Sequence, residues 1–203
     1  MPTSLLERSP LRIRTSLVFR LPEGVQPSGS PLPLGLRLSP AEPDLIRLFF
    51  GGSALEAVFL DYLSQGFSGA VIHGPRAWAA YGWLSHPHTA GPVHLHPEIQ
   101  RQPAHWLFAF RTLPIWRERG LYKTGLRYLM SQALAQPHPG GIYVDTQAGN
   151  LASRRGILSV GFVPCGVAKT YIVGVPKLHW WKWGHWDAAQ PHPAADQDRF
   201  TRP

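Results

Sequence analysis

Glycine and proline divide this chain into short segments, and this division limits the folds that it can adopt. The 203 residues include 21 prolines and 20 glycines, and neither residue suits the interior of a helix or strand. Between them lie apolar runs with the strand period of two or the helical period of 3.6. With 44% hydrophobic residues, the chain is long enough for one well-packed domain and too apolar to be disordered throughout.

The segments predict a series of strands and helices. Strands are expected at 11–21, 69–73, 77–84, 106–112, 142–146, 162–166 and 170–175, and helices at 44–63 (in two parts broken at Gly51-Gly52), 116–136 and 151–160. Residues 22–43 predict a loop-rich insertion. This mixed order favours an α/β (α+β) fold, with a mixed β-sheet flanked by helices. We expect one domain over residues 1–176 and a tail over 177–203, rich in tryptophan and proline, whose end is disordered.

Charge and cysteine content narrow the function classes. The formal charge of +8 allows an anionic partner such as nucleic acid, a membrane surface, an acidic protein or a phosphorylated small molecule. Residues 117–155 hold six Lys/Arg against two Asp/Glu, which favours the phosphorylated molecule. The single cysteine, Cys165, rules out a disulfide framework within the chain. With no apolar run of roughly 18 residues and no apolar signal region, we expect a cytoplasmic protein that is not integral to a membrane.

A predicted strand ends at Pro114 and runs into a helix through a basic, glycine-containing loop. The first turn of a helix has backbone N–H groups without intrahelical partners and the positive end of the dipole, so it binds phosphate oxygens. Gly120 permits close approach of the backbone. Arg117, Arg119 and Lys123 would add charge-assisted contacts. This segment therefore predicts a pyrophosphate site.

Two motifs in this part of the chain resemble those of the GCN5-related N-acetyltransferase (GNAT) superfamily. Arg-x-x-Gly-x-Tyr at 117–122 is similar to the family's pyrophosphate motif, Gln/Arg-x-x-Gly-x-Gly/Ala. Asn-x-x-Ser at 150–153 and Gly-Phe at 161–162 are similar to its Asn-x-x-Ala/Ser helix and closing Gly-Phe. The matching order covers roughly residues 105–166. It implies the acyl-CoA N-acyltransferase fold, with a centrally splayed sheet and acetyl-CoA or another acyl-CoA bound where two parallel strands separate.

The resemblance also implies the cofactor-binding residues. The pantetheine would pair with the backbone of 110–113, the pyrophosphate would rest on 117–123, and Asn150 would bond the pantetheine side. The implied set is Phe110, Arg111, Thr112, Leu113, Arg117, Glu118, Arg119, Gly120, Leu121, Tyr122, Lys123, Asn150, Ser153 and Arg154.

The acid and the base are less well defined. Ile157 stands where many family members carry a tyrosine that protonates the departing thiolate. Asp145 and His105 are the catalytic candidates for deprotonating the amine, and residues 94–98 offer two histidines and a glutamate as alternatives. Asp145 also has a plain interpretation as a solvated or capping carboxylate, and water-mediated deprotonation stays open.

Histidines and tryptophans outside these motifs have competing interpretations. The pairs His86-x-His88 and His94-x-His96 have ligand types that suit a metal, but their proline-rich surroundings favour loop histidines, so we expect no metal. Residues 180–186 contain four tryptophans. They could pack across the open sheet edge, form a homodimer, contact lipid or an acyl chain, or stack on bases.

The leading hypothesis is an N-acetyltransferase that moves an acetyl group from acetyl-CoA to a primary amine by direct attack in a ternary complex. The acceptor would be a small molecule or a protein, without nucleic acid as partner. One alternative is a long-chain N-acyltransferase, similar to an N-acyl amino acid synthase, that uses an acidic acyl carrier protein. Another is a catalytically degenerate protein that binds CoA without turnover.

Overall fold

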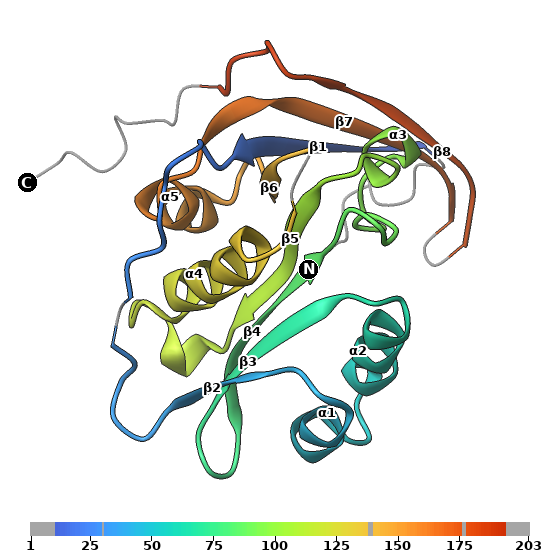
Figure 1. Cartoon of the computed structure of the whole chain (residues 1–203). Helices are drawn as coiled ribbons and strands as arrows, with labels where there is room; N and C mark the ends of the chain where they lie inside the picture. Colours follow the sequence, from blue (N-terminus) through green and yellow to red (C-terminus); the bar gives the residue numbers. More distant parts are fainter. Residues whose placement is uncertain (1–10, 30, 138–139, 176–177, 194–203) are drawn as a thin grey trace, which may run out of the picture.

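A single eight-stranded sheet organises the described residues, which are 11–29, 31–137, 140–175 and 178–193 of the computed structural model (Figure 1). The strands lie in the order β2-β3-β4-β5-β6-β1-β7-β8. In chain order the elements are β1 (Leu11–Arg20), β2 (Arg37–Pro40), α1 (Pro43–Phe50), α2 (Ala54–Ser64), β3 (Ser68–His73), β4 (Trp78–Ser85), α3 (Pro97–Gln100), β5 (His105–Thr112), a 3-10 turn (Pro114–Trp116), α4 (Leu121–Leu134), β6 (Ile142–Gln147), α5 (Leu151–Ser159), β7 (Val163–Val175) and β8 (Leu178–Asp187). The predicted mixed sheet flanked by helices is confirmed.

The sheet opens at its centre. Strands β5 and β6 are its parallel pair, and they are joined at three positions only, from His105 opposite Ile142 to Leu107 opposite Val144. Beyond these positions the two strands separate, and all other neighbouring strands in the sheet run antiparallel. The separation leaves one edge of β5 without a strand beside it.

Helices cover both faces of the sheet around this opening (Figure 1). Apolar side chains of α4 and α5 pack on one face with Leu17 and Phe19 of β1. Residues of α1, α2 and α3 pack on the other face with Val18. Successive side chains of β1 therefore pack into the cores on opposite faces of the sheet, because side chains alternate along a strand. No helix in the described part of the chain is long and apolar enough to cross a membrane.

Four elements differ from the sequence prediction. Strand β2 lies inside the expected 22–43 loop, where pairing with β3 stabilises it. The helix expected from 116 begins at Leu121, because Gly120 takes a left-handed conformation (φ +77°) at its N-cap. The two strands expected over 162–175 form one strand, β7, in which Gly166 (φ +84°) lies at a bulge. The short helix α3 lies in the predicted 85–104 loop.

The boundary expected at residue 176 does not end the sheet, because β8 pairs with β7 along its length. Trp186 packs against Trp106 and Tyr143 and donates its indole N–H to the Cys165 carbonyl at 2.8 Å. Trp181 and Trp183 lie on the other face, where their rings contact each other at a tilt of 33°, and they are 65% and 37% exposed. Strand pairing and packing thus account for much of the tryptophan-rich segment. The end expected to be disordered or extended comprised residues 188–203, of which 194–203 lie outside the described residues.

Candidate active site

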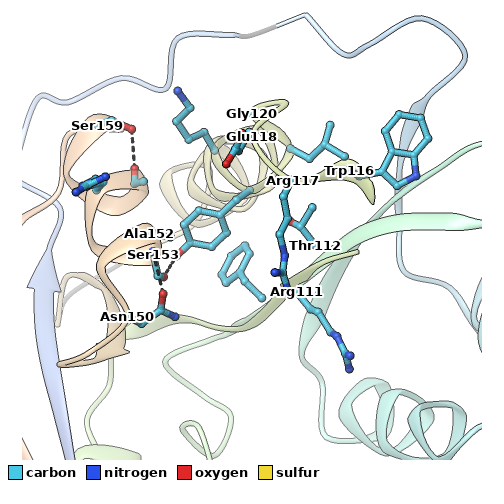
Figure 2. Close-up of a pocket in the computed structure, with 16 residues that line it drawn as sticks. Arg111, Thr112, Trp116, Arg117, Glu118, Gly120, Asn150, Ala152, Ser153 and Ser159 are labelled. Atoms are coloured by element: carbon cyan, nitrogen blue, oxygen red, sulfur yellow. Dashed lines mark hydrogen bonds between the residues drawn. The ribbon is translucent and has the colours of Figure 1, made fainter. Parts of the chain in front are cut away.

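Two cavities meet where β5 and β6 separate. The larger, of about 760 Å³, lies between the end of β5, the first turn of α4 and the helix α5 (Figure 2). The smaller, of about 270 Å³, lies on the β1 and β6 side. Phe110, Tyr122, Asn150 and Ser153 line both cavities. A molecule that fills one cavity therefore reaches the other at these four residues.

The larger cavity has the features of an anion site at the start of α4. The first helical hydrogen bond joins Thr124 N to Gly120 O at 3.0 Å, so the N–H groups of residues 121–123 have no partner within the helix. Arg117 and Lys123 line the same cavity and add positive charge. Glu118, with φ +63°, also lines it and brings one carboxylate to the loop.

Most of the residues implied for the cofactor lie together around this cavity. Its lining includes eleven of the fourteen: Phe110, Arg111, Thr112, Arg117, Glu118, Gly120, Leu121, Tyr122, Lys123, Asn150 and Ser153. Three lie elsewhere. Leu113 donates its N–H to Ala79 O, Arg119 lies over the Trp116 ring at 5.1 Å, and Arg154 bonds Pro193 O at 2.9 Å.

Asn150 has a structural role in addition to the implied one. Its side-chain oxygen accepts a hydrogen bond from Ser153 N at 3.1 Å and caps α5 (Figure 2). The side-chain NH₂ group is the part of Asn150 that remains able to donate to a ligand.

Two aromatic rings form the floor where the cavities meet, and glycines make room for them. The rings of Phe110 and Tyr122 contact edge to face, with centroids 5.3 Å apart. A methyl group on Gly82 of β4 would overlap the Phe110 ring, and one on Gly156 of α5 would lie 2.6 Å from the Tyr122 ring. Strand β5 bulges at Ala109 (φ +53°), opposite Gly82. No local sequence pattern reveals this arrangement, because its glycines lie far apart in the chain.

The Tyr122 hydroxyl lies at the junction of the cavities. It makes a 2.7 Å hydrogen bond with the Ser153 hydroxyl (Figure 2). Burial raises the pKa of Tyr122 to about 12, so it keeps its proton at neutral pH. Ile157, one turn along α5 from Ser153, is fully buried in the core.

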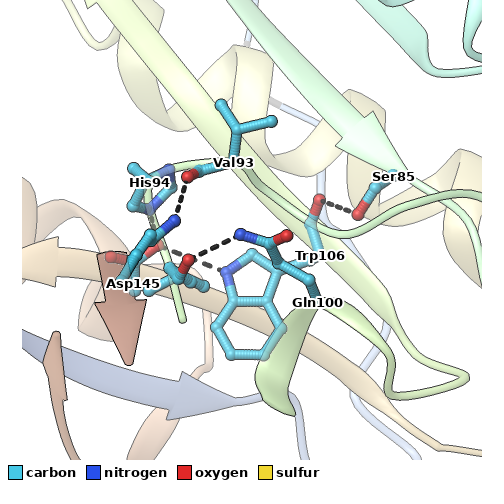
Figure 3. Close-up of polar contacts among 8 residues, drawn as sticks. Ser85, Val93, His94, Gln100, Trp106 and Asp145 are labelled. Carbon is cyan, nitrogen blue, oxygen red and sulfur yellow. Dashed lines mark hydrogen bonds and ion pairs between the residues drawn. The ribbon is translucent and has the colours of Figure 1, made fainter. Parts of the chain in front are cut away.

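A histidine and a carboxylate pair in the smaller cavity. His94 Nε2 lies 2.8 Å from Asp145 Oδ1, which also accepts the Trp106 indole N–H at 3.2 Å (Figure 3). The Asp145 side chain is only 2% exposed. Burial opposes its ionisation, but His94 and other polar neighbours outweigh that effect and hold the pKa of Asp145 below its usual range. The carboxylate thus fixes one ring nitrogen of His94, which leaves Nδ1 as a candidate proton acceptor.

The two catalytic candidates have different positions. Asp145 lines the smaller cavity, behind His94. His105 is buried at the start of β5, packs against the His86 ring at 5.2 Å and lines neither cavity. His94, from the loop between β4 and β5, was one of several open alternatives, and no local pattern singled it out. Among the described residues, no group of three or more His, Cys, Asp or Glu side chains is arranged to hold a metal ion.

Comparisons with known proteins identify the fold. A protein from Drosophila matches with a TM-score of 0.59 and 14% identity, over 83% of this chain and 53% of its own. A protein from Novosphingobium aromaticivorans, assigned to the GNAT family of acetyltransferases, has a TM-score of 0.53 and 17% identity, over 78% and 63%. A GCN5-related N-acetyltransferase from Sphaerobacter thermophilus has a TM-score of 0.52 and 14% identity, over 93% and 57%.

The chain spans between half and two thirds of the length of these three structures. No protein-family model matches its sequence. No curated protein matches it either. The family resemblance seen in the sequence is therefore supported at the level of three-dimensional structure, and the chain has the fold of the GCN5-related N-acetyltransferases.

Proposed function

We propose that this chain is an acyl-CoA-dependent N-acetyltransferase, which moves an acetyl group from acetyl-CoA to a primary amine by direct attack in a ternary complex. The observation that carries the proposal is the meeting of two cavities at the splayed strands. One cavity has a helix N-terminus with cations, and the other has a histidine fixed by a carboxylate. Such a pair of sites suits a donor with a pyrophosphate and an acceptor with a proton to lose.

The larger cavity would hold acetyl-CoA. The N–H groups at the start of α4, with Arg117 and Lys123, would bind the pyrophosphate. The free edge of β5 would pair with the pantetheine amides, and the side-chain NH₂ of Asn150 could add a hydrogen bond. With the pyrophosphate at α4 and the pantetheine along β5, the thioester would lie at Phe110 and Tyr122, where the smaller cavity begins.

The side chains at the junction would accept and donate the protons of the reaction. His94, oriented by Asp145, would take a proton from the ammonium and pass it to solvent, and would later take the second proton after the C–N bond forms. As the C–S bond breaks, Tyr122 would protonate the leaving sulfur and recover a proton through Ser153 or solvent. One proton is released overall for each acetyl group transferred. Tyr122 would thus supply the acid that Ile157 cannot.

The smaller cavity bears on the choice among the alternatives. Its volume of about 270 Å³ and its lining of Arg14, His94, Asp145, Gln147 and Asn150 suit a compact polar acceptor. No observation in the described residues favours a long acyl chain or an acyl carrier protein.

The test is release of free CoA thiol from acetyl-CoA in the presence of a panel of primary amines. We expect turnover with at least one small polar amine. His94→Gln should lower kcat by about 100-fold or more without weakening CoA binding, and Arg117→Ala/Lys123→Ala should weaken CoA binding by about 10-fold or more. Arg76→Gln, in the exposed turn between β3 and β4, is the control. Binding of CoA without turnover of any amine would favour the degenerate protein, and absence of binding would refute the proposal.

A further inference from the structure

A row of cations lies beside the smaller cavity, on the face of the sheet that carries Asp145. Arg12 and Arg14 are two residues apart on β1 and so lie on one face. Across the sheet, Arg12 is opposite Ile172 of β7, and Ile172 is opposite Lys182 of β8. Asp145 is opposite Val18, which continues the same face of β1. We call Arg12, Arg14 and Lys182 the basic row.

One carboxylate, that of Asp145, lies near the basic row within the described residues. Neither arginine has an ion pair there, and the Nε atoms of both are buried without a hydrogen-bond partner. Asp145 is the acidic residue that lines the smaller cavity, where its Oδ1 bonds His94 and Trp106. The nearby Arg14 helps to lower the pKa of this carboxyl, so one carboxylate faces three cations. Buried donors without partners are costly in a folded protein.

The charges of the basic row oppose one another. Burial and the nearby Arg14 lower the pKa of Lys182 to about 8. The Lys182 ammonium donates a hydrogen bond to the Val93 carbonyl, next to His94, and so connects the basic row to the loop that carries His94. His96, from the same loop, is fully buried, and its nearest carboxylate, Glu98, is 68% exposed at 3.9 Å. Three cations beside a single carboxylate, which His94 also contacts, leave an excess of positive charge that suits an anion.

We propose that the acceptor amine carries a carboxylate, which Arg14 binds at the mouth of the smaller cavity. This inference rests on the proposed function. His94 and Arg14 line the same cavity of about 270 Å³, so a single small molecule can present its amine to one and its carboxylate to the other. The guanidinium can bind a carboxylate through two parallel hydrogen bonds. Arg12 and Lys182 strengthen the positive potential around it. The acceptor class is therefore the small amino acids.

The test compares amines that differ only in the carboxylate. Serine and ethanolamine form one pair, and lysine and cadaverine form another. For each, kcat/KM is measured with acetyl-CoA, and binding of the N-acetylated product is measured by calorimetry with CoA present. We expect a preference of about 10- to 100-fold for the carboxylate-bearing member. Phosphoethanolamine is included, and preference for it over every amino acid would overturn the carboxylate assignment.

Substitutions of Arg14 test whether this residue causes the preference for the carboxylate. Arg14→Gln should abolish it by lowering kcat/KM for the carboxylate-bearing member more than for the decarboxylated member, and Arg14→Lys, which keeps the charge but loses the paired hydrogen bonds, should retain part of it. Arg76→Gln should behave like wild type. Equal values for both members in wild type, or a preference that survives in Arg14→Gln, would overturn the inference.

The two proposals can fail separately. Acetyl transfer without a carboxylate preference would overturn this inference and leave the acetyltransferase intact. Selective binding of the carboxylate-bearing product without any acetyl transfer would support the anion site and refute the proposed activity.

Discussion

Whether replacing Gly156 by alanine raises or lowers the free energy of unfolding depends on the Tyr122 ring, which Gly156 contacts. In most helix interiors, replacing glycine by alanine stabilises the fold by about 1 kcal/mol. At Gly156 the new methyl carbon would lie 2.6 Å from the Tyr122 ring, well inside van der Waals contact. Overpacking of this kind costs about 1 to 3 kcal/mol. We therefore expect Gly156→Ala to lower the free energy of unfolding by up to about 2 kcal/mol and to weaken CoA binding.

Gly125 in α4 is a matched control. An added methyl carbon there would lie 3.7 Å from the Phe110 ring, which is ordinary contact, so Gly125→Ala should be neutral or stabilise by up to about 1 kcal/mol. Urea denaturation measures the free energy of unfolding of each variant, and calorimetry measures the affinity for CoA.

The double variant isolates the cause. In a Tyr122→Ala background the ring is absent, so Gly156→Ala should stabilise the protein by about 1 kcal/mol instead of destabilising it. A Gly156→Ala variant more stable than wild type by about 1 kcal/mol, the gain expected in a helix without this contact, would refute the packing argument. So would the same loss of stability with and without the ring, because the cause would then lie outside this contact.

Three further predictions concern charges near the two cavities. Asp145→Asn should lower kcat by about 100-fold or more and the free energy of unfolding by about 1 to 3 kcal/mol. Because the pKa of Asp145 is lowered in the fold, the stability difference from wild type should be full near neutral pH and should shrink below about pH 4. A difference in urea denaturation that does not depend on pH would contradict this prediction. Glu118→Gly removes a carboxylate and a left-handed non-glycine residue from the pyrophosphate loop, so CoA should bind up to about five-fold more tightly by calorimetry, and weaker binding would contradict the placement of the phosphates. Affinity for a carboxylate-bearing product should fall as pH rises through about 8, where Lys182 loses its proton beside Arg14 and His96, and Lys182→Met should remove this fall.

Local sequence signals predicted the centre of the fold well. The helix α4 has a strong apolar period, and the strand before it, the basic loop that contains Gly120 and the Asn-x-x-Ser motif at 150–153 are each short local patterns. Each of these features is set by residues a few positions apart, so a single sequence can report it. Eleven of the fourteen implied residues lie around one cavity for the same reason.

Sheet order was not predictable from the same signals. Strand β1 lies between β6 and β7, more than a hundred residues away in the chain. Its alternating residues show that it is a strand but not which strands pair with it. The sequence predicted a tail where β8 lies, because tryptophans fit several environments. The pairing of β8 with β7 shows that this segment belongs to the sheet.

The candidate catalytic pair was also beyond local reasoning. His94 lies in a loop rich in proline and histidine, 51 residues from Asp145, and neither residue has a neighbour in sequence that marks it. The same holds for Arg14, which looked like one of several alternating basic residues in a strand. The fold brings these three side chains into one cavity.

A crystal structure with CoA bound tests the central claim most directly. We expect the pyrophosphate against the first turn of α4, within reach of Arg117 and Lys123, and the sulfur at the junction of the two cavities beside Tyr122. CoA bound outside the space between α4 and α5, CoA bound with its sulfur away from the splayed strands, or no binding at a saturating concentration would each contradict it.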